Sequence, residues 1–166
     1  MAERKRQQKT HTLQSARTIG LLFDATLEKQ GREVVEFARK LEKAGKQVRI
    51  LGYFKTKQSP GQQPFDFFYQ NETTWTGQPK SDKANSFLRE KFDLLLCLNP
   101  LDDRSVEWIS TLSPAAMKVG LATQRPHEFD LQLEIPAPKG FGYFAEQLHL
   151  YLDKIVLTTN EPARAI

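Results

Sequence analysis

The chain of 166 residues lacks the sequence features that usually identify an enzyme. It contains no glycine-rich phosphate loop of the Gly-x-x-x-x-Gly-Lys or Gly-x-Gly-x-x-Gly type, and no serine in a nucleophile elbow. Its three histidines, at positions 11, 127 and 149, show no metal-ligand spacing. These absences disfavour P-loop NTPases, dinucleotide-dependent enzymes and zinc proteins.

Cysteine and long apolar runs are also scarce. The one cysteine, Cys97, lies within the apolar run Leu94–Leu98, where a core position is expected, and nothing implies a disulfide. No apolar stretch approaches the roughly 20 residues of a membrane span. The basic N-terminus precedes no apolar segment of a secretory signal. We therefore expect a cytoplasmic protein in a reducing compartment.

The body of the protein carries no net charge. Five basic residues against one acidic residue give residues 1–17 the whole formal charge of +4, so residues 18–166 sum to zero. We expect residues 1–17 to form a flexible basic arm that contacts RNA, an anionic surface or an acidic partner. A solvated arm without a partner is the alternative. The cations assigned to partner binding are Arg4, Lys5, Arg6 and Lys9.

The sequence does contain an alternation of strand and helix patterns. Strands are expected at about 18–23, 47–54, 65–69, 92–98, 117–121 and 130–135, and helices at about 28–44, 81–90, 104–112 and 141–156. This order predicts one three-layer, Rossmann-like α/β domain over residues 18–156 with a mostly parallel sheet. The arm precedes the domain, and a C-terminal tail at 157–166 follows it.

The first strand ends in a carboxylate and a hydroxyl, Asp24 and Thr26, rather than in glycines. Ligands of open α/β sheets collect at the carboxyl ends of the strands. There, a carboxylate can hold magnesium or bind a ribose hydroxyl, and Thr26 can donate to a phosphate. The pattern resembles the nucleophile strand of haloacid-dehalogenase-type phosphatases, but Thr26 stands where that family has a second acid. Alternatively, the two residues cap the following helix.

More polar residues follow the apolar strand at 92–98. If they lie near Asp24, their carboxylates would form a hard-cation site, and Arg104 would hold a phosphate. The alternative is that Asp102 or Asp103 caps the helix beginning near Arg104. The candidate ligand site, with magnesium as its cofactor, consists of Asp24, Thr26, Asn99, Asp102, Asp103 and Arg104.

An aromatic loop, Trp75–Lys80, lies between the predicted edge strand and the next helix. The ring of Trp75 beside Lys80 can stack on a base or on a partner's side chain. A tryptophan in a long loop more often anchors that loop to the domain, which is the alternative. The aromatic segment at 65–69 could also pair edge to edge in a homodimer.

Four segments carry a family resemblance: Gly20–Thr26, Trp75–Lys80, Phe92–Leu96 and Met117–Gly120. Their order resembles a family of small bacterial α/β proteins classed as a domain of unknown function. That resemblance covers about residues 18–156 and implies a fold without an activity. More distantly, residues 92–121 resemble part of the N-terminal Rossmann-like lobe of heptosyltransferase-type glycosyltransferases. In those enzymes a second lobe, for which this sequence has no counterpart, holds most of the nucleotide sugar.

These patterns favour a non-catalytic binding or adaptor module, because the usual catalytic devices are absent. In this interpretation the basic arm and the aromatic loop, with Trp75 and Lys80, contact another macromolecule. The alternative is a phosphate- or nucleotide-binding protein or enzyme at the strand ends, with magnesium. Carboxylates of Asp24 and Asp102 that converge in an open cleft would indicate a site, whereas carboxylates at helix N-termini would indicate caps.

Overall fold

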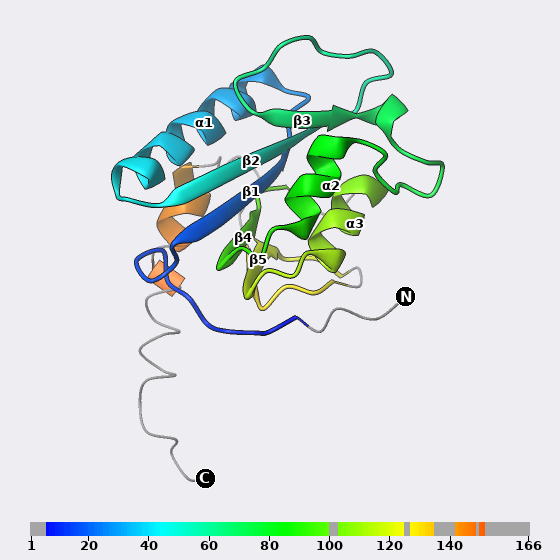
Figure 1. Cartoon of the computed structure of the whole chain (residues 1–166). Helices are drawn as coiled ribbons and strands as arrows, with labels where there is room; N and C mark the ends of the chain where they lie inside the picture. The colour runs from blue at the N-terminus through cyan, green and yellow to red at the C-terminus, as the bar shows by residue number, and fades with distance from the viewer. Residues whose placement is uncertain (1–5, 100–102, 125–126, 135–141, 149, 152–166) are drawn as a thin grey trace, which may run out of the picture.

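Six parallel strands form one sheet at the centre of the protein (Figure 1). The computed structural model describes residues 6–99, 103–124, 127–134, 142–148 and 150–151. The strands are β1 (Thr18–Asp24), β2 (Gln47–Phe54), β3 (Asp66–Tyr69), β4 (Leu94–Cys97), β5 (Met117–Leu121) and β6 (Leu131–Leu133). Their order is β3-β2-β1-β4-β5-β6, with every neighbouring pair parallel. This arrangement confirms the predicted Rossmann-like α/β domain.

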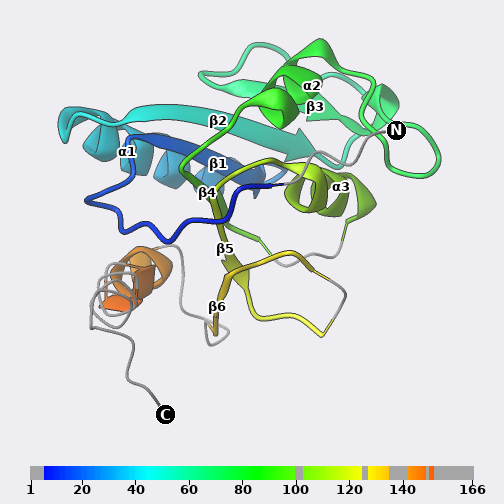
Figure 2. The ribbon, with the colours of Figure 1, turned by 60° about the horizontal axis from the view of Figure 1, so that its bottom comes forward.

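Helices cover both faces of the sheet and give the predicted three layers (Figure 2). α1 (Glu28–Lys43) and helical residues 142–148 pack on one face, whereas α2 (Asp82–Arg89) and α3 (Arg104–Leu112) pack on the other. A short 3-10 helix, η1 (Gln70–Glu72), follows β3. The chain changes face after β3 because it then crosses back over the sheet to β4 by a right-handed connection. No helix within the described residues is long and apolar enough to cross a membrane.

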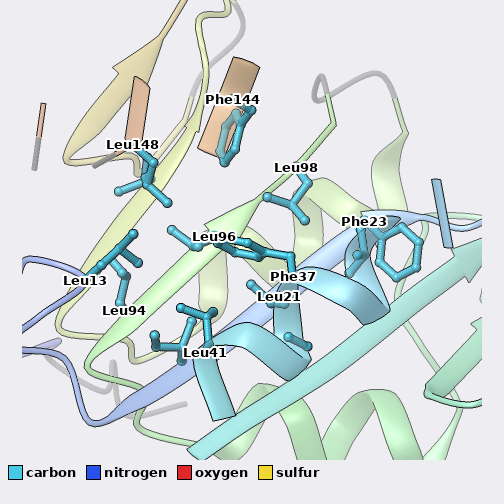
Figure 3. Packing of buried hydrophobic residues seen from close by; sticks show 14 of the residues in the cluster. Leu13, Leu21, Phe23, Phe37, Leu41, Leu94, Leu96, Leu98, Phe144 and Leu148 are labelled. Carbon is cyan, nitrogen blue, oxygen red and sulfur yellow. The ribbon is translucent and has the colours of Figure 1, made fainter. Parts of the chain in front are cut away.

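Two apolar clusters fill the spaces between the layers. Figure 3 shows the cluster on the α1 face, where Leu94 and Leu96 of β4 lie between α1 and Leu148. β4 is buried along its whole length, as its continuous apolar sequence predicts for a central strand. Cys97 belongs to the cluster on the other face, and burial raises the pKa of its thiol to about 12. The predicted core position of this cysteine is confirmed.

Residues 6–17 pack against the amino edge of the sheet, where the strands begin. Arg6 donates to both carboxylate oxygens of Asp130, at 2.8 and 2.6 Å, and the N–H of Lys9 donates to the carbonyl of Ala116 at 3.0 Å. Leu13 is buried in the core cluster shown in Figure 3. The flexible arm expected from the composition is therefore wrong for residues 6–17. The expected tail at 157–166 lies outside the described residues.

The connection from β2 to β3, residues 55–65, contains no helix. Parallel strands are usually joined by a helix that packs on the sheet. Figure 1 shows this connection as a wide loop next to α1. β3 is an edge strand, as expected, and its face toward α1 is covered only in part: Phe67 and Tyr69 remain half-buried.

Candidate functional site

The carboxyl ends of β1 and β4 meet where the order of the strands reverses, the usual ligand position in this fold. The N–H of Asp24 donates to the side-chain oxygen of Asn99 at 2.6 Å. Asn99 and Gln30 of α1 exchange two amide hydrogen bonds of 3.2 Å. The structure therefore brings Asp24 and Asn99 together and ties both strand ends to α1.

Asp24 and Thr26 join β1 to the chain that leaves β2. The carboxylate of Asp24 accepts a hydrogen bond from the N–H of Thr26 at 2.9 Å and pairs with the ammonium of Lys55 at 3.3 Å. The hydroxyl of Thr26 accepts from the N–H of Lys55 at 3.0 Å. The N-cap of α1 is Leu27, which makes no side-chain cap. The alternative that Asp24 and Thr26 cap α1 is therefore wrong.

The first turn of α3 holds the other predicted ligand residues. Asp103 is the N-cap of α3, and its carboxylate accepts from the N–H of Ser105 at 2.8 Å, as the capping alternative predicts. The Asp103 carboxylate therefore occupies one of the backbone N–H groups at the start of α3 that would otherwise bind an anion. Arg104 is exposed and makes no ion pair with another described residue. Asp102 lies outside the described residues.

A hollow of about 480 Å³ connects α3 to the aromatic loop. Its lining includes Tyr53 at the end of β2, Asp103 and Arg104 of the α3 turn, and Trp75 of the loop. Burial raises the pKa of the Tyr53 phenol, and the negative charge of Asp103 raises it further. Asp103 and Arg104, two of the predicted ligand residues, thus share one hollow with the aromatic loop, whereas Asp24 does not line it.

The Trp75 turn, residues 73–79, is held by its own backbone. Its two ends form an antiparallel bridge. The N–H of Thr74 donates to the carbonyl of Gln78 at 2.9 Å, and the N–H of Gly77 donates to the carbonyl of Thr74 at 2.9 Å. These bonds fix the turn without using the side chain of Trp75.

Gly77 sets the turn against α3. Its φ of +94° lies in the region that side chains disfavour, and a Cβ at this position would lie 2.7 Å from the Cβ of Arg104. Only glycine satisfies both conditions, because any other residue would be strained and would also clash with the helix. The turn therefore packs directly against the start of α3.

Trp75 stands at the tip of this turn and is 90% exposed. The expectation that it anchors the loop is wrong. Beside it lies a second hollow of about 470 Å³, and Arg104 lines both hollows. Leu112, in its wall, is 53% exposed. We refer to the following group as the Trp75 surface: Trp75, Thr76, Arg104, Glu107, Trp108, Thr111 and Leu112.

The cations assigned to partner binding are not gathered at one place. The side chain of Arg6 is only 12% exposed and pairs with Asp130. The side chains of Lys9 and Lys80 are exposed, at the amino edge and at the end of the aromatic loop respectively. Arg4 and Lys5 lie outside the described residues. The described part of the N-terminus therefore does not present a basic arm.

The polar side chains of Asp24 and Asn99 already have hydrogen-bond or ion-pair partners within the fold. No buried side-chain nitrogen or oxygen in the described ranges lacks a hydrogen-bond partner. Within the same ranges, no group of three or more histidine, cysteine, aspartate or glutamate residues is arranged to hold a metal ion. The contacts of Asp24 and Asn99 are those of a structural link between strands, whereas the Trp75 surface presents exposed aromatic and charged groups to solvent.

For several residues near this edge of the sheet, the sequence does not predict the position that the structure gives them. Lys55 directly follows the second strand. This position is the only sequence feature that indicates an ion pair with Asp24, at the end of the neighbouring strand. Trp108 and Leu112 fit the helical period with the core residues Val106 and Ile109, and therefore look buried. Instead, Trp108 is half-buried and Leu112 exposed, because α3 turns that side toward the Trp75 turn.

Over residues 1–155 the sequence matches a family of unknown function, DUF6913, and the chain belongs to that family. This confirms the resemblance to a domain of unknown function. No curated protein and no solved structure matches the chain. The family carries no assigned activity, so the case for a function depends on the surfaces just described.

Proposed function

We propose that the chain is a non-catalytic binding module that docks a protein partner through the Trp75 surface. The observation that carries this proposal is the 90% exposure of an indole on a turn fixed by backbone hydrogen bonds. A rigid aromatic side chain loses little conformational entropy on binding and buries a large apolar area. Tryptophan and arginine are also the residues that most often dominate binding energy at interfaces.

The neighbours of Trp75 favour a protein over a nucleic acid. Trp108 and Leu112 line an apolar hollow that can accept a partner's side chain. The hollow beside Trp75 is lined by one cation, Arg104, and one acid, Glu107, so this surface lacks the basic surplus that attracts a phosphate backbone. Arg104 at the rim supplies a cation for a carboxylate of the partner. We therefore assign partner binding to the Trp75 surface instead of to the predicted basic arm.

The test is capture of a binding partner by the immobilised full chain from a nuclease-treated extract of the source cells. Trp75→Ala should remove the retained protein. Leu27→Ala is the matched control, because Leu27 is also a large apolar residue, 71% exposed, outside the Trp75 surface. Equal retention by the Trp75→Ala variant and the parent chain would exclude this surface. A partner captured from an untreated extract but not from the nuclease-treated one would indicate base stacking instead.

The second candidate function is binding of a phosphate or nucleotide, with magnesium, at the strand ends. The hollow of about 480 Å³, which contains Tyr53, Arg104 and Ser105, favours it. Melting of the full chain with inorganic phosphate or nucleotides, with and without magnesium, tests it, since a ligand of the folded state raises the melting temperature. Arg104→Gln, which changes a cation lining the hollow, should abolish any rise. If none of these ligands raises the melting temperature, this candidate is wrong.

A further inference from the structure

A groove of about 990 Å³ runs along α1, on the opposite face of the sheet from α3 and the Trp75 surface. One wall consists of α1 side chains between positions 28 and 43, and residues 62–65 form the other. Ala25 and Phe54 lie at its base. The groove shares no lining residue with either hollow at the Trp75 surface.

The groove occupies the place where a helix would normally pack. A right-handed crossover from β2 to β3 passes over the same face as α1, and such connections usually contain a helix. Here residues 55–65 form a loop, and Phe65 is the only one of them that packs on the apolar cluster between the sheet and α1. Gly52 makes room for it, because a Cβ there would lie 2.7 Å from the Phe65 ring.

The walls of the groove combine apolar and basic groups. Val35, Phe54 and Phe65 provide apolar contacts. Four α1 cations line the groove against two acids: Arg32, Arg39, Lys40 and Lys43 against Glu28 and Glu36. Arg32 pairs with Glu28 at 3.4 Å and Lys40 with Glu36 at 4.0 Å. Arg39 and Lys43 have no acidic partner among the described residues, which leaves two positive charges along one wall.

We propose that this groove binds an acidic amphipathic helix of a partner protein, which takes the position of the absent crossover helix. Its apolar stripe would pack on Val35, Phe54 and Phe65, and its flanking carboxylates would face Arg39 and Lys43. Sixteen residues of α1 extend about 24 Å, so a bound helix of about 15 residues would follow the groove along its length.

A second copy of the chain fits the groove less well. In a two-fold dimer the groove of one copy would face the groove of the other, so two surfaces with the same surplus of positive charge would meet. Like charges at close range are unfavourable, whereas a helix with glutamates on its flanks would neutralise them. Because the groove and the Trp75 surface lie on opposite faces, one chain could hold two partners at once, which goes beyond the single docking site proposed above.

The test uses a displayed library of helical 15-residue peptides, selected on the immobilised full chain. Selected peptides should carry a stripe of leucine-like residues flanked by glutamate or aspartate. Arg39→Glu/Lys43→Glu should weaken their binding about tenfold or more, and Arg39→Gln/Lys43→Gln should weaken it less. Arg89→Glu/Lys91→Glu is the matched control, with the same change of charge at exposed sites outside the groove.

Three results would overturn the proposal. They are a library that yields no binder sensitive to Arg39 and Lys43, binders with basic flanks, and a free chain that sediments as a dimer dissociated by Val35→Asp. The last would assign the groove to a second copy. Trp75→Ala should leave peptide binding unchanged, so failure at this groove and failure at the Trp75 surface are separate outcomes.

Discussion

The N-terminal segment, residues 6–17, and the Trp75 turn are both irregular stretches with a fixed conformation, but they are held by different means. The segment lies at the amino edge of the sheet and buries Leu13 in the core. The turn lies by the start of α3 and is closed by hydrogen bonds within its own backbone. A segment that is fixed by side chains has used them in folding. A turn that is fixed by its backbone leaves its largest side chain available for a partner.

The cations of the two regions differ in the same way. Asp130 holds the segment by accepting hydrogen bonds from Arg6, from Gln8 at 3.0 Å and from the N–H of Lys118 at 2.8 Å. The cation of Arg6 is therefore neutralised within the fold. Arg104 beside the Trp75 turn has no such partner among the described residues and remains available at the surface.

The largest effect is expected where the segment enters the core. Leu13→Ala should lower the free energy of unfolding by about 3 kcal/mol, because it leaves a cavity among packed side chains. Urea denaturation measures this change. Gln14→Ala, at the exposed neighbouring position, should stay within about 0.5 kcal/mol of the parent. If both variants were equally stable, the segment would not be anchored by its buried side chain.

A smaller effect is expected when the backbone of the turn is strained. Gly77→Ala should cost about 2 kcal/mol and weaken partner capture, because it combines a positive φ with a clash against Arg104. Gly61→Ala measures the cost of the positive φ without the clash. Gly61 also has a positive φ, +84°, but no atom lies within 4 Å of the added Cβ. Equal losses of stability in the two variants would show that the contact with α3 does not hold the turn.

The stability of the domain should also depend on pH, through the ammonium of Lys118, which donates to the carbonyl of Thr111. Burial, and then the charge of Arg6, lower the pKa of Lys118 from 10.5 to about 8. Above pH 8 the folded state loses this proton while the unfolded state keeps it, so stability should rise with pH. The slope should approach about 1.4 kcal/mol per pH unit.

Urea denaturation between pH 7 and 9 measures this rise relative to Lys118→Met, which should lack it. Above pH 9 the buried thiol of Cys97, with its pKa of about 12, acts in the opposite direction, because only the unfolded chain then loses the thiol proton. A parent chain and a Lys118→Met variant with parallel pH profiles would contradict the buried, charged lysine.

The smallest effect on folding is expected at Trp75 itself. Trp75→Phe should leave the free energy of unfolding within about 0.5 kcal/mol of the parent, because the ring contributes little to the core. Iodide quenching should lose its strongly accessible component in this variant and retain the weaker quenching of half-buried Trp108. A large loss of stability would mean that the ring anchors the loop after all.

Much of the fold could be predicted from the sequence because its elements have clear periods. Val34, Phe37 and Leu41 fall on one face of α1, and the uninterrupted apolar run of β4 marks a central strand. Gly45 ends α1 with a φ of +89°, as a C-terminal glycine should. In residues 6–17 only Leu13 and Ala16 join the apolar core, and their spacing among polar neighbours forms no period that reveals their burial.

The candidate site could be predicted only in part. Topology alone brings the ends of β1 and β4 together, which places Asp24 near Asn99. The exposure of Trp75 depends instead on how Gly77 meets Arg104, a tertiary contact with no trace in the local sequence. The ion pair between Asp24 and Lys55 likewise requires β2 to lie next to β1.

The burial of Cys97 in β4 has a practical consequence. It is the only cysteine in the chain, it is fully buried, and its thiol stays protonated near neutral pH. An alkylating reagent can therefore reach it only when the central strand opens, so the rate of labelling reports unfolding of the domain without any introduced probe. Any partner that binds the folded state should slow that labelling, whichever face of the sheet it occupies.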